Sequence, residues 1–466
     1  MSKNILIIGG GITGLSTAYY LKKEIQNKNL PYSIKLVEAS DRLGGKIETV
    51  KKEGFTIERG PDSFLSRKPP TLNLIKSLGM EDQLVRNSTG QAYVLVKGKL
   101  HKIPSGSFMG IPIHLKPFLF SGLVSPIGKL RAGFDLVKKK SAPAKDQPLG
   151  TFFRYRFGDE LVENLIEPLL GGIYSGDLDK MSLMATFPDF YETEQKYGSL
   201  IKGLQATKPK PLSKKEKKNR PGAFFALKNG FESLVVELGK QFTEDEVTLN
   251  CAVDHVEKKA EHYNVLFDNG TVYQADSIVV ATPHNTLPKM FSEYSYFDHF
   301  KAMPQTSVAN VALAFDKTAI KKDLDGTGYV VSRNSDFRIT ACTWTHKKWA
   351  HAAPDDKILL RTYVGRPDDQ DVVNLSDDEI IEVVLNDLNK TMKINKDPLF
   401  TVVTRFKNKM PQYTVGHTDR VRETKAEMVS SLPGVYIAGS SLSGVAVPDC
   451  IEQGEEAVES VLQYLG

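Results

Sequence analysis

The fold of this chain is decided by the stretch Asn4-Ile5-Leu6-Ile7-Ile8-Gly9-Gly10-Gly11-Ile12-Thr13-Gly14-Leu15. An apolar run typical of a buried strand enters a Gly-x-Gly-x-x-Gly turn, and a helix is expected to leave it. Gly9 permits the tight turn, Gly11 lets a pyrophosphate approach the backbone because it has no Cβ, and Gly14 lets the helix lie close to the strand. Free N–H groups at the helix start would then face the phosphates of a dinucleotide.

Two further signals extend this fingerprint. The expected strand Ser33–Val37 ends at Glu38, near the spacing at which an acid accepts hydrogen bonds from an adenosine ribose. A second glycine pair follows in Arg42–Lys46, and the segment Glu58–Ser63 comes soon after it. An NAD-binding fold does not need this second pair, whereas flavoproteins of the amine oxidase superfamily carry such a turn beside the FAD pyrophosphate. The sequence therefore indicates FAD, and the alternative is a surface turn with solvated charges.

The composition is that of an ordinary globular protein. Its 466 residues predict two or three domains, and 41% of them are hydrophobic and 25% charged. The formal charge of +5 suits an anionic substrate or a membrane surface but requires neither. The three cysteines form no CxxC pair, which favours a reduced, cytoplasmic setting, and no apolar run is long enough to predict a spanning helix. The histidines suggest no metal set, and His346 and His351 are expected at the surface.

The expected fold class is α/β, with a discontinuous Rossmann-like FAD domain, a mixed-sheet substrate domain and a mainly helical insertion. The expected boundaries are residues 1–66, 221–300 and 403–466 for the FAD domain, 67–99 and 301–402 for the substrate domain, and 100–220 for the helical part.

Local patterns predict several elements inside these parts. Apolar periodicity predicts helices over Phe231–Phe242 and Asp377–Met392, and a strand is expected over Val247–Cys251. Asn269-Gly270 predicts a hairpin turn, because these residue types adopt the positive φ angles that such turns need. The run Lys208–Lys218 is too charged to pack and lacks interleaved aromatics, so it predicts an exposed loop without nucleic-acid binding. Further strands are expected over 277–281, 307–315, 339–344 and 359–364.

The C-terminal segment carries another set of glycines. Gly434–Gly439 predicts a short buried strand that ends in glycine, and a helix is expected from about Pro448 to Leu465. Such a segment puts backbone donors against an isoalloxazine ring, and the helix dipole would point at its N1/O2 edge. The alternative is a plain terminal strand and helix.

Long strings of uncommon residues give the chain a family resemblance over nearly its whole length. They are Glu167–Asp177, Met410–His417, Val447–Ile451, and Asn334–Phe337 followed by Ala341–Trp344. The chain resembles the FAD-dependent protoporphyrinogen and coproporphyrinogen III oxidases, most closely the Gram-positive bacterial type. The resemblance implies a fold like those of p-hydroxybenzoate hydroxylase and the amine oxidases.

The same resemblance implies a reaction. It is the oxygen-dependent, six-electron oxidation of coproporphyrinogen III to coproporphyrin III in heme biosynthesis, with hydride transfer to FAD and release of hydrogen peroxide. The alternatives are a protoporphyrinogen IX oxidase, or another amine oxidase or desaturase of the superfamily. Two departures argue against amine oxidation: Ser440 stands where many amine oxidases have an acid, and the strand Ser307–Phe315 lacks their usual lysine. Phe406 replaces a tryptophan that is common in close relatives, which changes one expected FAD contact.

Site residues are carried over from matching motif positions. Lys68 is expected to bind a propionate of the substrate, and Ile173 and Tyr363 are expected to line the substrate pocket; each has an ordinary surface or core role as its alternative. No general base and no catalytic side chain is assigned. The residues expected to contact FAD are Gly9, Gly11, Ile12, Thr13, Gly14, Glu38, Ala39, Arg42, Gly45, Lys46, Gly60, Pro61, Asp62, Ser63, Val253, Phe406, Gly439, Val447, Pro448, Asp449 and Ile451.

The expected partners are a porphyrinogen and molecular oxygen, with hand-off of the product to a ferrochelatase as a further expectation. We expect a cytoplasmic protein and leave peripheral membrane contact open. The apolar stretch Phe108–Phe120 suits either a lipid surface or the roof of the substrate cavity, and we favour the cavity.

Overall fold

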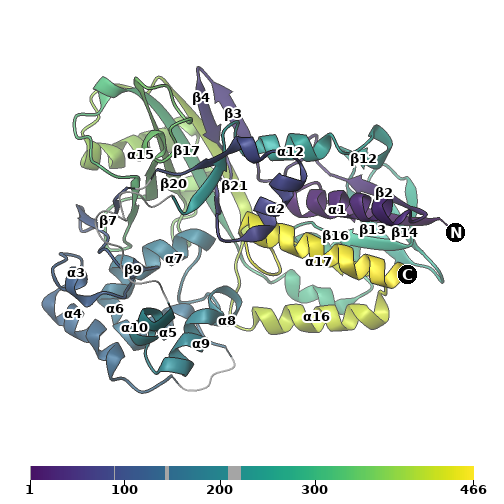
Figure 1. Ribbon diagram of the computed structural model, residues 1–466, viewed down its shortest axis with the longest axis horizontal. Helices are drawn as coiled ribbons and strands as arrows, with labels where there is room; N and C mark the ends of the chain where they lie inside the picture. The colour runs from purple at the N-terminus through teal and green to yellow at the C-terminus, as the bar shows by residue number, and fades with distance from the viewer. Residues whose placement is uncertain (1, 89, 142–145, 208–221) are drawn as a thin grey trace.

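The dinucleotide-binding part is built on one parallel sheet whose strands come from widely separated stretches (Figure 1). The computed structural model describes residues 2–88, 90–141, 146–207 and 222–466. The sheet order is β12 (Val247–Thr248), β2 (Tyr32–Val37), β1 (Lys3–Ile8), β16 (Ser277–Val280) and β22 (Val435–Ile437). The central strands are apolar runs because helices and loops cover both faces of a parallel sheet.

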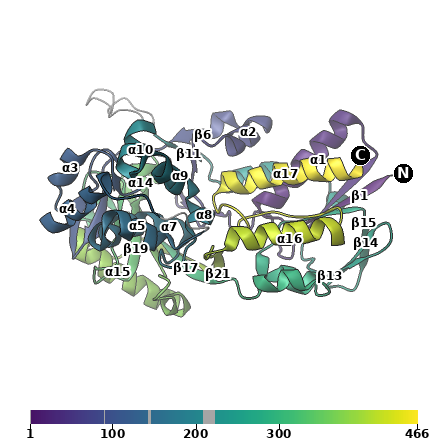
Figure 2. The same cartoon turned by 90° about the horizontal axis from the view of Figure 1, so that it is seen from below.

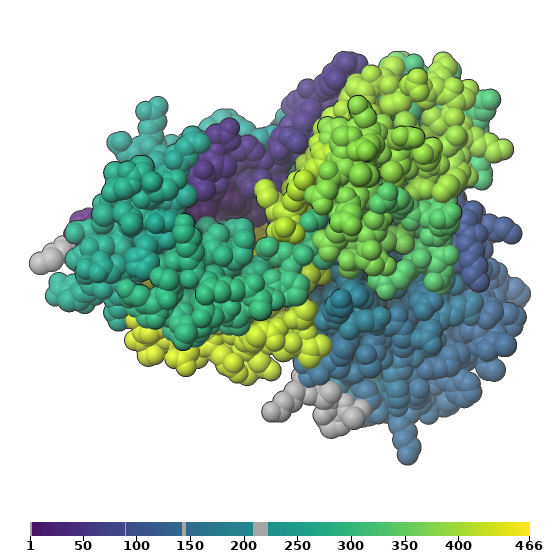
Figure 3. Space-filling model, turned by 180° about the vertical axis from the view of Figure 1, so that it is seen from behind, coloured from purple at the N-terminus to yellow at the C-terminus, as the bar shows by residue number. Residues whose placement is uncertain are grey.

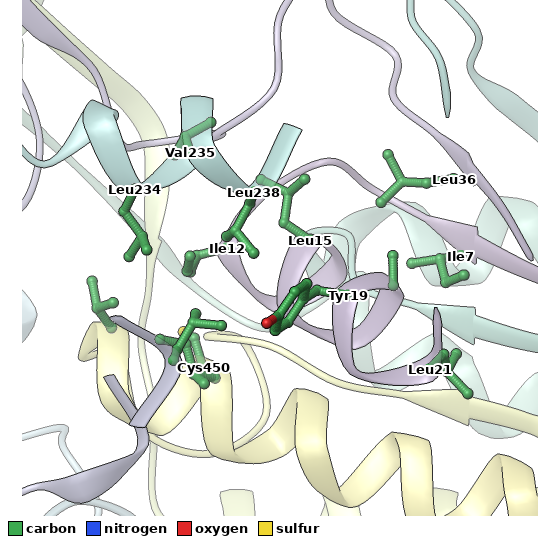
Figure 4. Close-up of a cluster of buried hydrophobic side chains, with 14 of the residues drawn as sticks. Ile7, Ile12, Leu15, Tyr19, Leu21, Leu36, Leu234, Val235, Leu238 and Cys450 are labelled. Carbon is green, nitrogen blue, oxygen red and sulfur yellow. The ribbon is translucent and has the colours of Figure 1, made fainter. Parts of the chain in front are cut away.

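Helices distant in sequence pack together on this sheet. α1 (Ile12–Lys28) contacts both α17 (Val447–Leu465) and α12 (Glu232–Gly239). Figure 4 shows apolar side chains of α1 lying between those of α12 and Cys450 of α17. Each fully buried large apolar side chain contributes about 1.5–3 kcal/mol. This core therefore fixes the first turns of α1 and α17 relative to each other.

A seven-stranded mixed sheet forms a second part (Figure 1). Its order is β21 (Phe400–Pro411), β17 (Gln305–Asp316), β20 (Lys357–Val364), β19 (Ile339–Trp344), β18 (Gly328–Val331), β7 (Ala92–Val96) and β8 (Lys99–Lys102). All neighbours are antiparallel except β18 and β7. α15 (Asp377–Met392) packs its apolar side on this sheet and begins at a capping box made by Ser376 and Glu379.

The helical insertion forms a third part, which lies at the opposite end of the molecule from the parallel sheet (Figure 2). Its helices are α3 (Leu115–Leu119), α4 (Pro126–Gly133), α5 (Leu149–Phe157), α6 (Asp159–Leu161), α7 (Glu167–Tyr174), α8 (Leu183–Thr186), α9 (Pro188–Tyr197) and α10 (Leu200–Thr207), with a short hairpin of β9 (Ser107–Phe108) and β10 (Ile111–Pro112). Its core contains a fully buried ion cluster, in which Arg156 lies 2.6 Å from Asp135 and 3.1 Å from Glu194.

Smaller elements connect these parts. The remaining helices are α2 (Pro69–Ser77), α13 (Leu287–Met290), α14 (Thr345–Lys348) and α16 (His417–Ser431). The remaining strands are β3 (Thr49–Lys52) with β4 (Phe55–Glu58), β5 (Phe64–Leu65) with β11 (Phe224–Leu227) and β6 (Leu84–Arg86), and β13 (Val253–Lys258) with β14 (Tyr263–Phe267) and β15 (Val272–Ala275). Among the residues described, none of the helices combines the length and apolar character needed to cross a bilayer.

The structure corrects several local predictions. The strand expected over 247–251 spans only β12, and only Gly270 of the Asn-Gly turn has a positive φ, at +82°. His346 and His351 are half-buried instead of exposed, and the His346 Nδ1 lies 3.1 Å from the Leu359 carbonyl oxygen. The expected boundaries at residues 99 and 403 fall inside β8 and β21, which both stay in the seven-stranded sheet. The basic run Lys208–Lys218 lies outside the described residues.

Candidate functional site

One continuous cavity of about 2910 Å³ joins the three parts. It starts at the glycine turns of the parallel sheet, passes the loop before α17, and ends between the seven-stranded sheet and α7. Figure 3 shows the surface hollowed where the teal segment, the purple N-terminal residues and the yellow C-terminal residues meet. Every residue expected to contact the cofactor lines this cavity except Gly14, Asp62 and Ile451.

The two glycine turns near the N-terminus form one surface. The backbone N–H of Gly44 donates to the Gly10 carbonyl at 2.8 Å, and a bridge joins Gly44 to Gly11. A Cβ built on Gly11 would meet nothing within 4 Å, whereas one on Gly14 would lie 1.9 Å from the Gly9 carbonyl oxygen. Gly11 therefore keeps open space in front of the backbone, and Gly14 is required by the packing of the helix on the turn.

Charged groups surround this open space. α1 begins at Ile12 with no side-chain cap, so its first N–H groups stay available to an anion. The Glu38 carboxylate accepts from the Gly10 N–H at 2.6 Å. Burial lowers the pKa of Lys46, and this side chain has no hydrogen-bonding or ionic partner among the described residues. Arg42 lines the cavity too, but its guanidinium donates to backbone carbonyls, including that of Ile47 at 2.9 Å, and so braces the second turn.

The loop between β22 and α17 forms the next wall. Gly439 has a φ of +124°, which only glycine adopts without strain. Val447, Pro448 and Asp449 open α17 and line the cavity, and Asp449 forms a close ion pair with Lys68. The residue expected to bind a substrate carboxylate thus holds a protein carboxylate at the start of α17.

Ile451 and Asp62 have other roles. Ile451 is fully buried in the apolar core under α1. Asp62 does not line the cavity but pairs with two cations that do, Lys348 at 3.2 Å and Arg361 at 3.3 Å. Burial opposes ionisation of Asp62, but Lys348 and Arg361 outweigh it and hold the pKa of its carboxyl well below the usual range. Burial also raises the pKa of the nearby Glu58 to about 7.

The substrate end combines apolar, aromatic and cationic groups. Ile173, in the last turn of α7, is 43% exposed and lines the cavity. Tyr363 lies on β20 facing the cavity, and the Arg361 guanidinium is 5.2 Å from its ring centre. Burial raises the pKa of Tyr363, which keeps its hydroxyl protonated. Lys348 and Arg361 also line the cavity and were not predicted from the sequence. The alternation of β20 could have indicated Arg361, because residues two apart on a strand share a face.

The stretch 108–120 divides between the two expected roles. Phe108 and Met109 line the cavity, and Phe118 is buried in the core of the insertion. Phe120, in contrast, is 84% exposed. The preference for the cavity therefore holds for the start of the stretch and is wrong for its end.

Comparison with known proteins agrees with this geometry. The sequence profile described as flavin containing amine oxidoreductase matches residues 12–462. The chain belongs to this family. A flavin held by a dinucleotide fingerprint is FAD, and the open Gly11 surface, the uncapped α1 and the unpartnered Lys46 fit its pyrophosphate.

Individual family members match over their full length. The chain is 52% identical to the coproporphyrinogen III oxidase of Bacillus subtilis, with 99% of this chain and 98% of the relative covered. It is 44% identical to the coproporphyrinogen III oxidase of Staphylococcus aureus, with 100% of both covered. A crystal structure from Exiguobacterium sp. 255-15, assigned as a protoporphyrinogen oxidase, superposes with a TM-score of 0.88 at 37% identity and 98% coverage of both chains. The family's FAD-dependent oxidase fold is thereby confirmed for this chain.

Proposed function

We propose that this chain oxidises coproporphyrinogen III to coproporphyrin III, with FAD as the cofactor and molecular oxygen as the final electron acceptor. The observation that carries this proposal is the continuity of the cavity. The glycine turns that fit FAD and the wall formed by Lys68, Ile173 and Tyr363 face one space. The full-length similarity to two coproporphyrinogen III oxidases supports the same reaction.

The reaction removes six hydrogens from a macrocycle with four sp³ bridging carbons. When bound, FAD supplies a two-electron acceptor, and three molecules of oxygen take up the six electrons and six protons as three molecules of hydrogen peroxide. The chain's task is to hold a bridging carbon close to the acceptor in a space that excludes water. Ile173 and the ring of Tyr363 suit the pyrroles, and Lys68, Lys348 and Arg361 suit the propionates.

We infer the remaining assignments from the same cavity. We propose that FAD contacts the cavity-lining residues of both glycine turns and of the loop before α17. The other proposed contacts are Gly60, Pro61, Ser63, Val253 and Phe406. The expected division into FAD, substrate and helical domains stays a proposal, with all of β8 and β21 assigned to the substrate domain. We assign no general base. Of the carboxylates that line the cavity, Glu167 is paired with Arg333 and Asp449 with Lys68.

The test is a comparison of substrates with purified, FAD-loaded protein. Coproporphyrinogen III with oxygen should give fluorescent coproporphyrin and three equivalents of hydrogen peroxide. The value of kcat/KM should be at least about 10-fold lower for protoporphyrinogen IX, because one lost charge-assisted contact costs about 1.5 kcal/mol or more. A preference for protoporphyrinogen IX would support a protoporphyrinogen IX oxidase instead. Turnover of amines alone would support another amine oxidase of the superfamily.

We propose in addition that the outer face of α3 and α4 rests on an anionic membrane surface. Ile127, Leu130, Phe134 and Val137 are exposed and follow one another at helical spacing, with Phe120 beside them in sequence. Lys116, Lys139 and Lys140 supply the exposed charges of residues 115–140, since the one acid, Asp135, is buried. An apolar face with cationic neighbours is typical of an interfacial segment.

Vesicle binding tests this second proposal. The protein should sediment with phosphatidylglycerol-containing vesicles and not with phosphatidylcholine vesicles, and Leu130→Glu should abolish the difference. Equal recovery with both vesicle types, or retained binding of the variant, would contradict it. The hand-off of the product to a ferrochelatase stays a prediction.

A further inference from the structure

The loop Gly439–Ser443 is held by side chains from several distant elements. All five residues line the cavity. Gln453 accepts from the Gly439 N–H at 3.1 Å and donates to the Ser443 carbonyl, so it closes the loop from the side of α17. The Ser441 hydroxyl lies 3.1 Å from the His284 Nδ1. The two carbonyls between these points, those of Ser440 and Leu442, are bound by a third group of side chains.

That third group is a stacked pair at the end of β21 and the start of α16. The Tyr413 hydroxyl donates to the Ser440 carbonyl at 2.6 Å, and the His417 Nε2 lies 2.9 Å from the Leu442 carbonyl oxygen. The two rings are parallel within 8°, with centres 4.3 Å apart. Both residues are buried, at 1% and 2% exposure. Because Nε2 faces a carbonyl oxygen, it carries the proton and donates.

The pair is fixed from behind by the helical insertion. Tyr174, next to the cavity-lining Ile173, packs the edge of its ring on Tyr413 with centres 5.6 Å apart. Gln412 donates to the Tyr174 carbonyl at 2.9 Å, and the Ser182 N–H donates to the Tyr413 carbonyl at 2.8 Å. The Met410–His417 string, which the proposed function leaves without a role, therefore connects the substrate side of the cavity with the loop.

We infer that Tyr413 and His417 are positioning residues that hold the loop Gly439–Ser443 in the conformation needed to bind FAD. A free five-residue loop would lose conformational entropy when binding orders its backbone. The hydrogen bonds to the Ser440 and Leu442 carbonyls remove part of that freedom before the cofactor arrives. The inference rests on FAD binding, which family membership supports, and does not depend on the identity of the porphyrinogen.

The test removes one hydroxyl at a time. Tyr413→Phe keeps the ring stack and deletes only the bond to Ser440. The matched control is Tyr436→Phe, because the Tyr436 hydroxyl makes the same kind of bond, 2.9 Å to the Ser460 carbonyl, away from the cavity. His417→Phe is the second variant; it keeps an aromatic ring beside Tyr413 and leaves the Leu442 carbonyl without its donor. For each variant, three quantities are measured: the release of FAD from the holoprotein after dilution, the visible spectrum of the bound flavin, and the melting temperature.

Tyr413→Phe and His417→Phe should raise the Kd for FAD by about 5- to 10-fold and alter the flavin spectrum, as expected for one lost hydrogen bond. Tyr436→Phe should lower the melting temperature as much as the two cavity-side variants do, but it should leave the Kd for FAD and the flavin spectrum unchanged. Unchanged Kd and spectrum in both cavity-side variants would overturn the inference. An equal rise in Kd for Tyr436→Phe would overturn it too, since it would show a general effect of stability.

Discussion

Reversing the charge of Lys68 tests the substrate end of the cavity most directly. Lys68 directly precedes α2, lines the cavity and pairs with Asp449, the first acid of α17. A substrate propionate must therefore share this cation with Asp449 or displace it. A charge-assisted contact contributes about 1.5–3 kcal/mol when well buried. Because the Lys68 side chain is 40% exposed, solvent screening favours the lower end of that range. Lys68→Glu should then raise KM for coproporphyrinogen III by about 10-fold or more.

The assay measures KM and kcat with coproporphyrin fluorescence as the readout, at low and high salt. Lys68→Met separates loss of the cation from added repulsion with Asp449 and should show the smaller increase in KM. Lys76→Glu is the matched control, because Lys76 lies on the same helix, is exposed and does not line the cavity. If Lys68→Glu leaves KM unchanged, or if Lys76→Glu changes it equally, Lys68 does not bind the substrate.

Three further predictions concern the cofactor site and the stability of the fold. Gly11→Ala should leave the melting temperature unchanged but weaken FAD binding by about 10-fold or more, whereas Gly14→Ala should unfold the protein, because its Cβ would lie 1.9 Å from a backbone oxygen. Arg156→Met should lower the free energy of unfolding by about 3–5 kcal/mol in denaturant titrations, since it leaves two buried carboxylates unpaired; a loss below about 1 kcal/mol would contradict this. Burial lowers the pKa of His417 to about 4, so the native state resists its protonation, and stability should fall by about 3 kcal/mol as pH decreases from 6.5 to 4. His417→Gln should flatten that part of the pH profile.

The backbone-dictated parts of the site were predictable from the sequence. Gly9, Gly11 and Gly14 have roles set by φ, by the absence of a Cβ and by helix packing, and these do not depend on distant residues. The helix Asp377–Met392 was also predicted with its observed bounds, because its capping residues and apolar periodicity are local signals.

The missed parts depend on contacts between residues far apart in the sequence. Asp62 meets Lys348 and Arg361 because the segment after β4 contacts β17 and β20 of the seven-stranded sheet, and no local pattern predicts that pairing. β21 was not predicted as a strand, and a domain boundary was placed inside it. It is an edge strand whose residues 407–409 are exposed, so its sequence lacks the apolar alternation of an inner strand.

The parallel sheet has a consequence for biosynthesis. β22 and α17 are translated after residues 1–434, yet they supply the last strand, a core helix and the loop beside the cofactor. A nascent polypeptide that still lacks them presents β16 as an open edge and only part of the flavin's binding surface. Cofactor loading must accordingly wait until β22 and α17 have been synthesised, and an mRNA truncated before the codons of β22 should yield colourless, aggregation-prone product.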